Sequence, residues 1–390
     1  MQMPVYRNEK AKGEKKWWYQ FYTGEIRNGV RQRITKRGFK TKREAERAMV
    51  EAQAARQKGQ YVEPSRILFR DYLQDWLKTK RNLGEQTLEL YHSYLRTHII
   101  PSLGHIPLAK LSAHDIEMFL NSLHEKGLAA GTVKRIFSVV NAALHAAETK
   151  ELIAKNAANK VEKPQVSRRR KLVVWDPAFV NVFLEQTKQT SRHWIAVYLA
   201  VMTGMRQGEI LGLRWSDIDF EKRNLTIQQT VNRHGEIKQG AKTKQSMRSV
   251  ALSPETIEVL QEHRRLIMME RTALGSAYEN HDLVVCTKFG GPVTQRTIQK
   301  VWTSFLKKTG APKITFHDLR HTHASLLIKQ GVHIKVISER LGHSSVSITM
   351  DTYGHLMPNM QEDAAAGLDR LIQKKREVQC DDTKNPDHRV

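Results

Sequence analysis

The chain is 390 residues long, enough for two or three domains, and it carries 64 Lys and Arg against 40 Asp and Glu, a formal net charge of +24. That excess of positive charge implies a polyanionic partner, most simply a nucleic acid. No apolar run reaches the roughly 18 residues that a membrane-spanning helix needs, and the first residues lack the apolar core of a signal peptide. The two cysteines argue against a disulfide framework, so we expect a cytosolic protein.

The first sixty residues are the most basic part of the chain, with 16 Lys and Arg against 6 Asp and Glu. An aromatic-rich run over 17–22 favours a β-strand, and Asn28-Gly29 is a strong hairpin signal. The alternating segment 31–37 predicts the returning strand. We therefore predict a β-hairpin at the N-terminus.

A helix is predicted to follow this hairpin, from residue 42 to about 58, because Thr41 and Glu44 have the spacing of a capping box. Alternation places Arg31 and Arg33 on one face of the hairpin. A small basic sheet backed by a helix has the dimensions to enter a DNA major groove, so we expect these two arginines to contact DNA. A basic hairpin that only faces solvent is the alternative.

Residues 66–163 are expected to form a bundle of four helices. The second is predicted to end at Pro101, the third to begin at Ser112, and the fourth to begin near Val133. The first carries large apolar side chains at helical spacing, which we interpret as core and not as a base-stacking platform: Phe69, Tyr72, Leu73, Trp76 and Leu77.

Residues 164–172 are the clearest linker, with a proline, no apolar periodicity and a basic run. We interpret it as a strap on the DNA backbone that contacts phosphates and sets affinity and salt dependence. A nuclear-localisation signal is the generic alternative. The candidate contacts are Arg168, Arg169 and Arg170.

The segment 173–375 is predicted to be mostly helical, with one small sheet. Its strands are expected near 225–227 and 248–252, joined by a polar hairpin that contains Lys242. Residues 359–375 have the apolar pattern of a helix, and the polar tail 376–390 is expected to be disordered.

Six residues in the second half of the chain have types that suit metal-free cleavage of a phosphodiester. They are, in chain order, Arg206, Lys242, His317, Arg320, His343 and Tyr353. In this order, and with Thr203-Gly204 before the first of them, they resemble the active site of the tyrosine recombinase family, specifically a phage-type integrase. The resemblance covers nearly the whole chain.

Their chemistry explains the combination. Cleavage of a DNA phosphodiester adds negative charge to the non-bridging oxygens, which Arg206 and Arg320 can match with planar forks of N–H donors. His343 can donate a hydrogen bond to the same oxygens. As isolated residues, Arg206 would more often be a solvated charge and His343 a helix cap or a surface histidine. Arg320 could equally form a structural pair with His317.

The remaining positions have roles in proton transfer and orientation. Tyr353 is the candidate nucleophile, since no tyrosine follows Tyr278 except this one. His317 is the candidate base, and Lys242, preferred over Lys244, is the candidate acid for the leaving 5′ oxygen. Glu209, one helical turn after Arg206, is expected to orient either that arginine or the helix and not to take part in the chemistry. We expect His321 and His323 to pack or to face solvent.

The resemblance implies an α+β, mainly helical fold with an arm-type DNA-binding domain over 1–60, a core-binding domain over 66–163 and a catalytic domain over 173–375. It implies site-specific recombination of double-stranded DNA at core and arm sites by a homotetramer on DNA, through a 3′-phosphotyrosyl bond, with no metal, ATP or other cofactor. DNA-bending and directionality factors from the host or the element are further expected partners, and the expected location is the bacterial cytoplasm, at the nucleoid.

Three alternatives stay open. A type IB topoisomerase uses nearly the same residues but reseals a single strand. A non-catalytic DNA-binding regulator would retain the fold without needing Tyr353. A membrane-surface protein is the third, although no basic amphipathic helix with a large apolar face stands out.

Overall fold

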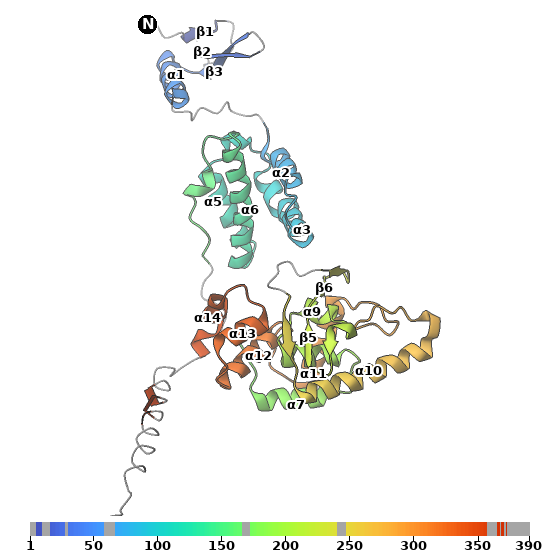
Figure 1. Cartoon of the computed structure of the whole chain (residues 1–390). Helices are drawn as coiled ribbons and strands as arrows, with labels where there is room; N and C mark the ends of the chain where they lie inside the picture. Colours follow the sequence, from blue (N-terminus) through green and yellow to red (C-terminus); the bar gives the residue numbers. More distant parts are fainter. Residues whose placement is uncertain are drawn as a thin grey trace, which may run out of the picture. The chain divides into compact units, whose positions relative to one another are not determined.

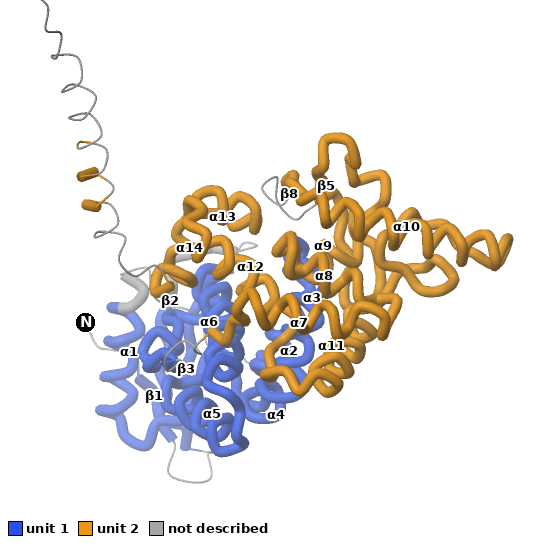
Figure 2. The backbone as a smooth tube through the Cα atoms, turned by 90° about the horizontal axis from the view of Figure 1, so that it is seen from below, with its two compact units in different colours: residues 1–169 blue, residues 170–390 orange. Residues whose placement is uncertain are grey.

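The computed structural model describes residues 5–9, 16–27, 30–57, 67–165, 172–239 and 247–356, together with five residues between 365 and 372. The chain forms two compact units, residues 1–169 and residues 170–390 (Figure 2).

The N-terminal part of the first unit is a three-stranded antiparallel sheet with one helix against it (Figure 1). Its strands are β1 (Val5–Arg7), β2 (Trp17–Arg27) and β3 (Val30–Phe39), in that order across the sheet, and α1 (Lys42–Gln57) follows. Tyr19 and Phe21 of β2 and Ile34 of β3 pack with Met49 of α1 in a small core. The predicted strand pair and helix are therefore confirmed.

The cap of α1 differs in one contact from the predicted capping box. The backbone N–H of Glu44 donates to Thr41 Oγ1 at 3.1 Å, as expected. The Glu44 carboxylate, however, accepts from the backbone N–H of Lys40 at 2.9 Å, one residue before the cap. The long glutamate side chain reaches past the cap and satisfies the preceding donor.

The other face of this sheet is exposed and carries aromatic and basic side chains. Strand register places Tyr22 opposite Arg33 and Trp18 opposite Arg37. The Arg37 guanidinium carbon lies 5.3 Å from the centroid of the Trp18 ring, and Tyr6 stacks on the same indole with a centroid distance of 4.5 Å. The stack holds the arginine against an aromatic surface.

The second part of the first unit is the predicted helical bundle. Its main helices are α2 (Phe69–Lys78), α3 (Glu85–Tyr94), α5 (Ala113–Glu125) and α6 (Ala130–Thr149). All five apolar residues of the α2 stripe are buried in a core separate from that of the N-terminal sheet. Ser112 caps α5 and forms a capping box with Asp115. The fourth helix begins three residues earlier than predicted, at Ala130.

The prediction that Pro101 ends the second helix is wrong. The helical path continues from α3 through a π-helical turn (Leu95–Ile99) into α4 (Ile100–Leu103). Pro101 lies in the first turn of α4. Proline is tolerated at such a position because a backbone N–H in the first turn has no acceptor within its own helix. The π-helical turn shifts the hydrogen-bond register, so the proline is accommodated and the chain turns only after Leu103.

The second unit is mostly helical, with one large apolar core and a smaller separate one that contains Ala324, Ile337, Leu341 and Tyr353. Its helices are α7 (Pro177–Thr187), α8 (Trp194–Thr203), α9 (Gln207–Gly212), α10 (Pro254–Leu274), α11 (Gln295–Thr309), α12 (Asp318–Lys329), α13 (Ile334–Leu341) and α14 (Val346–Tyr353). Nine of the ten residues of α8 are buried, which fits its almost entirely apolar sequence. Together with the small antiparallel sheets, these helices confirm the mainly helical α+β fold.

The sheet of this unit departs from the predicted simple hairpin. Strand β5 (Asn224–Thr226) pairs antiparallel with β8 (Ser249–Ala251) and with β4 (Ile218–Asp219). Between β5 and β8 the chain forms a second hairpin of β6 (Gln229–Val231) and β7 (Ile237–Gln239). The polar segment that was expected to join two strands therefore contains two further strands.

Several predicted features lie outside the described residues. These are the linker arginines Arg168, Arg169 and Arg170, the turn at residues 28–29, the tail 376–390 and nearly all of the helix predicted over 359–375. Within the described parts of the chain, no helix is both long enough and apolar enough to cross a bilayer.

Candidate active site

The ends of two helices meet at one place in the second unit. Helix α8 ends at Thr203 and helix α13 ends at Leu341. The glycine that follows each, Gly204 or Gly342, has a left-handed conformation, with φ of 66° and 65°. The last carbonyls of a helix have no intrahelical donor. Arg320 Nη1 donates to Gly204 O at 2.7 Å and Nη2 to Leu341 O at 2.6 Å, while Arg206 Nη2 donates to Gly342 O at 2.9 Å. The two arginines therefore close both helix ends.

Glycine is required at these two turns for steric as well as backbone reasons. A Cβ on Gly204 would lie 2.5 Å from Cδ2 of the buried His323. A Cβ on Gly342 would lie 2.7 Å from Nη1 of Arg248. The turns at Gly204 and Gly342 thus pack closely against His323 and Arg248, which fixes the carbonyl groups that Arg206 and Arg320 bind.

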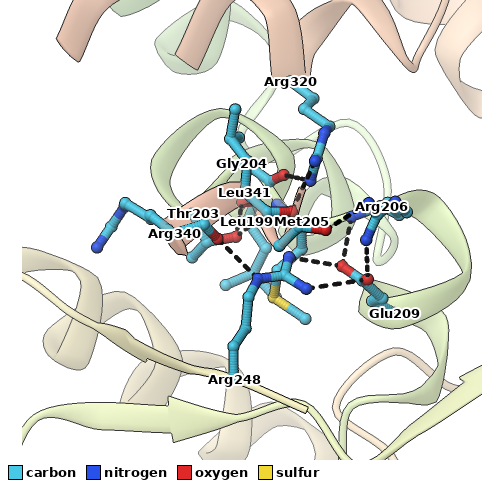
Figure 3. A network of polar contacts seen from close by, with 11 residues as sticks. Leu199, Thr203, Gly204, Met205, Arg206, Glu209, Arg248, Arg320, Arg340 and Leu341 are labelled. Atoms are coloured by element: carbon cyan, nitrogen blue, oxygen red, sulfur yellow. Dashed lines mark hydrogen bonds and ion pairs between the residues drawn. The ribbon is translucent and has the colours of Figure 1, made fainter. Parts of the chain in front are cut away.

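Glu209 of α9 lies between two arginines (Figure 3). Its carboxylate accepts from the backbone N–H and from Nη1 of Arg206, both at 2.8 Å. It also accepts from Nη1 and Nη2 of Arg248, at 3.1 and 2.8 Å. Burial acts to raise the pKa of Glu209, but hydrogen bonds and charge from Arg248, with those from Arg206, outweigh it and lower that pKa. Glu209 therefore stays ionised and orients Arg206.

Arg248 is part of the site but was not identified from the sequence. Its side chain is only 7% exposed, and its Nε donates to the carbonyl of Arg340 at 2.7 Å. The signal was present in the strand pattern, because Arg248 alternates with Val250 and Leu252, which are both buried. A charged residue on the buried face of a strand requires a buried partner, and here that partner is Glu209.

The two phosphate-binding candidates differ in exposure. Arg320 is 3% exposed, whereas the Arg206 side chain is 40% exposed. Burial, and then the charges of Arg206 and Arg248, lower the pKa of Arg320 to about 9, so it stays protonated at neutral pH. The site therefore combines a buried, fixed positive charge with a second one that solvent, or an anion, can reach.

Arg340 and His323 form a structural pair behind these arginines. His323 Nδ1 donates to Val201 O at 2.7 Å, which leaves Nε2 to accept from Arg340 Nε at 3.1 Å. Burial, and then the charge of Arg340, lower the pKa of His323 to about 3. His323 is thus a neutral, packed residue, in line with the sequence interpretation.

His343 follows the Gly342 turn and is partly buried. Its Nδ1 lies 2.8 Å from Thr349 Oγ1. Burial, and then the charges of Arg320 and Arg206, lower its pKa to about 4. A neutral imidazole whose Nδ1 accepts from Thr349 keeps an N–H on Nε2, the donor that a phosphate oxygen would need.

Tyr353 is the last residue of α14 and is 1% exposed. Its phenolic oxygen lies 2.7 Å from Nδ1 of His321 on α12. Burial raises the pKa of Tyr353 to about 12, although the charge of Arg320 acts to lower it. The expectation that His321 only packs or faces solvent missed this contact. The available signal was that His321 lies four residues after His317, on the same helix face.

His317 occupies the position before the first residue of α12, and its side chain makes no capping hydrogen bond. The carboxylate of Asp318 accepts from the backbone N–H of Thr315 at 2.6 Å. The His317 ring meets that of His321 edge-on, with centroids 5.3 Å apart. Burial, and then the charge of Arg320, lower the pKa of His317.

Other predicted site residues lie either outside the described parts of the chain or on the N-terminal sheet. Lys242, together with the alternative Lys244, lies outside the described residues. Arg31 and Arg33 are exposed on the N-terminal sheet, where Arg33 shares the open face with Trp18 and Arg37.

Three segments of the chain match models of known protein families. Residues 179–360 match the phage integrase family, residues 68–124 match the phage integrase N-terminal SAM-like domain, and residues 4–55 match an arm DNA-binding domain.

The chain is 29% identical to a tyrosine recombinase XerC-like protein of Caldanaerobacter subterraneus subsp. tengcongensis, over 85% of this chain and 90% of the relative. It is 30% identical to the ICEBs1 integrase of Bacillus subtilis, over 68% of this chain and 72% of the relative. Among solved structures it resembles the Tn1549 transposon integrase in complex with circular intermediate DNA, with a TM-score of 0.67, 21% identity and coverage of 78% of this chain and 99% of the other. The chain belongs to the phage integrase family of tyrosine recombinases.

Proposed function

We propose that this protein is a site-specific DNA recombinase that integrates and excises a mobile element by cutting and rejoining DNA strands through a 3′-phosphotyrosyl bond. The observation that carries the proposal is the cluster itself. Arg320 and Arg206 bind the carbonyls of Leu341 and Gly342, directly before His343, at 2.6 and 2.9 Å. The phenolic oxygen of Tyr353 lies 2.7 Å from Nδ1 of His321, the residue that follows Arg320. Such a cluster has the composition needed to bind and attack a phosphodiester.

Arg206 and Arg320 bind the scissile phosphate in this proposal. Arg320 uses two of its N–H donors on helix carbonyls and Arg206 uses one on Gly342 and one on Glu209, so each guanidinium retains donors for phosphate oxygens. Because these contacts exist before DNA arrives, the charges are already oriented when the transition state forms. His343 donates a further hydrogen bond to the same oxygens.

Cleavage then forms a bond between the Tyr353 phenolic oxygen and phosphorus and breaks the bond to the 5′ oxygen. A histidine near the start of α12 receives the phenolic proton, and Lys242 protonates the leaving oxygen. The phosphotyrosyl bond conserves the energy of the broken linkage, so a second 5′ hydroxyl can attack it without ATP. Glu209 acts on Arg206 and does not touch the phosphate.

DNA binding is divided among the parts of the chain. Residues 1–60 bind arm-type duplex sites through the exposed face of the N-terminal sheet, with Arg31 and Arg33 as contacts. Residues 66–163 and 173–375 hold the core site, and Arg168, Arg169 and Arg170 of the linker 164–172 contact phosphates. The separate apolar cores of the N-terminal sheet and the helical bundle support this division.

Exchange between two duplexes requires four strand cleavages, and each chain offers a single candidate nucleophile after its histidine motifs. A homotetramer on DNA supplies the four tyrosines. DNA-bending or directionality factors act with it, and the assembly associates with the bacterial nucleoid.

The decisive test uses purified protein and plasmids carrying the junction sequences of the element that encodes it. A recombinase yields products with exchanged flanking sequences from two sites. A type IB topoisomerase relaxes a supercoiled plasmid but does not exchange sequences between two sites. A DNA-binding regulator binds the plasmid without cutting it. Either of these results, without exchange, would overturn the proposal.

A further inference from the structure

The contact between His321 and Tyr353 joins two helices that are adjacent only in the folded chain. His321 lies on α12, directly after Arg320, and Tyr353 ends α14. Nδ1 of the histidine and the phenolic oxygen are 2.7 Å apart, within the range of a strong hydrogen bond. Because the tyrosine is 1% exposed, bulk water has little access to this proton.

The direction of this hydrogen bond follows from the charges around it. Burial, then the charges of His317 and Arg320, lower the pKa of His321, while Asp318 acts in the opposite direction. The phenol, with its pKa raised to about 12, retains its proton at neutral pH. The neutral imidazole therefore accepts at Nδ1 from the Tyr353 O–H and carries its own proton on Nε2.

The other three histidines near the site have different partners among the described residues. Both ring nitrogens of His323 are occupied, by Val201 O and by Arg340 Nε. Nδ1 of His343 pairs with the hydroxyl of Thr349. His317 contacts the edge of the His321 ring and has no hydrogen bond to the phenol. His321 is therefore the histidine whose free lone pair points at the nucleophile.

We propose that His321, and not His317, takes the proton from Tyr353 as the phenolic oxygen attacks phosphorus. The phenolic O–H bond breaks, an N–H bond forms at His321 Nδ1, and the phosphorus–5′-oxygen bond breaks as the phosphotyrosyl bond forms. In rejoining, a 5′ hydroxyl attacks phosphorus and gives its proton to Lys242, the phosphotyrosyl bond breaks, and the imidazolium returns its proton to the tyrosine oxygen. This inference rests on the proposed recombinase function and deepens it by assigning the base.

The test measures single-turnover formation of the covalent complex by the full chain on a nicked suicide duplex from the element's junction. The main variant is His321→Asn, whose side chain retains a hydrogen-bonding group near Nδ1 but cannot accept a proton. We expect its rate to fall about 100-fold, the order expected for loss of a general base. His317→Asn is the matched comparison, with a smaller loss, and binding of an intact duplex reports that each variant is folded.

A pH profile separates proton transfer from a structural role. The wild-type rate should fall as pH decreases through the pKa of His321, which lies below the ordinary value of 6.5, because protonated imidazole cannot accept. His321→Asn should lose this acid limb, whereas His317→Asn should retain it. Added imidazole should restore cleavage to His321→Ala, which offers the space of the missing ring.

Two failures can be told apart. In the first, the wild type forms a covalent complex that Tyr353→Phe abolishes, but His321→Asn cleaves within about threefold of the wild-type rate and keeps the same acid limb. His321 then only positions the tyrosine, so this inference is wrong while the recombinase function stands. If the wild type itself forms no complex on a duplex that it binds, the recombinase function fails, and the assignment of the base fails with it.

Discussion

Arg248 and Glu209 form a bidentate ion pair that connects the residue before β8 to helix α9, with N–O distances of 3.1 and 2.8 Å. Both side chains are almost completely buried, and the same carboxylate orients the partly exposed Arg206. The pair thus couples the packing of the sheet to the position of a phosphate-binding group, although neither residue is placed to contact DNA.

Replacing Arg248 should reduce both stability and cleavage. Arg248→Met leaves Glu209 with one cationic partner, and breaking a buried ion pair costs about 3 kcal/mol of unfolding free energy. Denaturant unfolding measures that loss, and single-turnover cleavage should fall because Arg206 is less firmly oriented. Arg214→Met is the control, since Arg214 pairs with the buried Asp217 elsewhere in the same unit. Equal cleavage by both variants would contradict the positioning role.

Gly204→Ala should destabilise the second unit more than Gly310→Ala. Both glycines end helices with nearly the same backbone conformation, φ 66° and ψ 16° against φ 64° and ψ 16°. Left-handed strain alone therefore costs each variant about 1–2 kcal/mol. A Cβ at Gly310 meets nothing within 4 Å, whereas one at Gly204 meets His323 at 2.5 Å. Unfolding curves of the two variants compare the clash directly, and equal midpoints would show that the turn adjusts.

His323 should make the protein less stable in mild acid. Its folded-state pKa of about 3 lies below the unfolded value of 6.5, so the unfolded chain binds the proton more readily below pH 6.5. This contribution to stability is fully present above the unfolded pKa and is lost as pH falls towards the folded pKa, at about 1.4 kcal/mol per pH unit.

The measurement is the unfolding free energy at pH 7 and at about pH 5, for the wild type and for His323→Asn. The variant lacks the titrating ring, so its stability should change less between the two conditions even if it starts lower. The same pH dependence in both proteins would place the acid sensitivity elsewhere.

The exposed face of the N-terminal sheet should contact DNA phosphates. Arg33→Ala should weaken binding of the full chain to a mixed-sequence duplex and lower the slope of log affinity against log salt by about 0.9, the contribution of one phosphate contact. Lys36→Ala removes another exposed charge, but Lys36 lies opposite the buried Tyr19 in the strand register and is therefore on the other face of the sheet. Comparable losses from both substitutions would indicate a general charge effect and not a DNA-binding face.

Local patterns predicted much of the fold. The α2 stripe and the strand of Arg33 follow from periods of 3.6 and 2, because one face of each element is buried. Pro101 led to a wrong helix end in the prediction. A proline disrupts a helix where its missing N–H removes a backbone hydrogen bond of the helix interior, and Pro101 lies in a first turn. The π-helical turn before it depends on packing in the bundle, which the local sequence does not specify.

The site residues that stand in recognisable motifs could be predicted from the sequence. The long-range contacts between site residues could not. Arg206, Arg320 and Tyr353 stand in recognisable motifs. The contact of His321 with Tyr353 spans 32 residues and that of Arg248 with Glu209 spans 39. Local spacing could therefore point to His321 and Arg248, but it could not identify the residues that they contact. Residues 229–239 form an additional hairpin whose first strand, β6, contacts α9, a tertiary contact that the local sequence does not show.

The most direct test of the account is covalent attachment through Tyr353. A nicked suicide duplex from the element's junction is incubated with wild type or with Tyr353→Phe, and the products are separated under denaturing conditions. We predict a protein–DNA band with the wild type, a DNA-linked peptide that contains Tyr353, and no band with the variant. A band that persists with Tyr353→Phe, or no band from a wild type that binds the duplex tightly, would contradict the account.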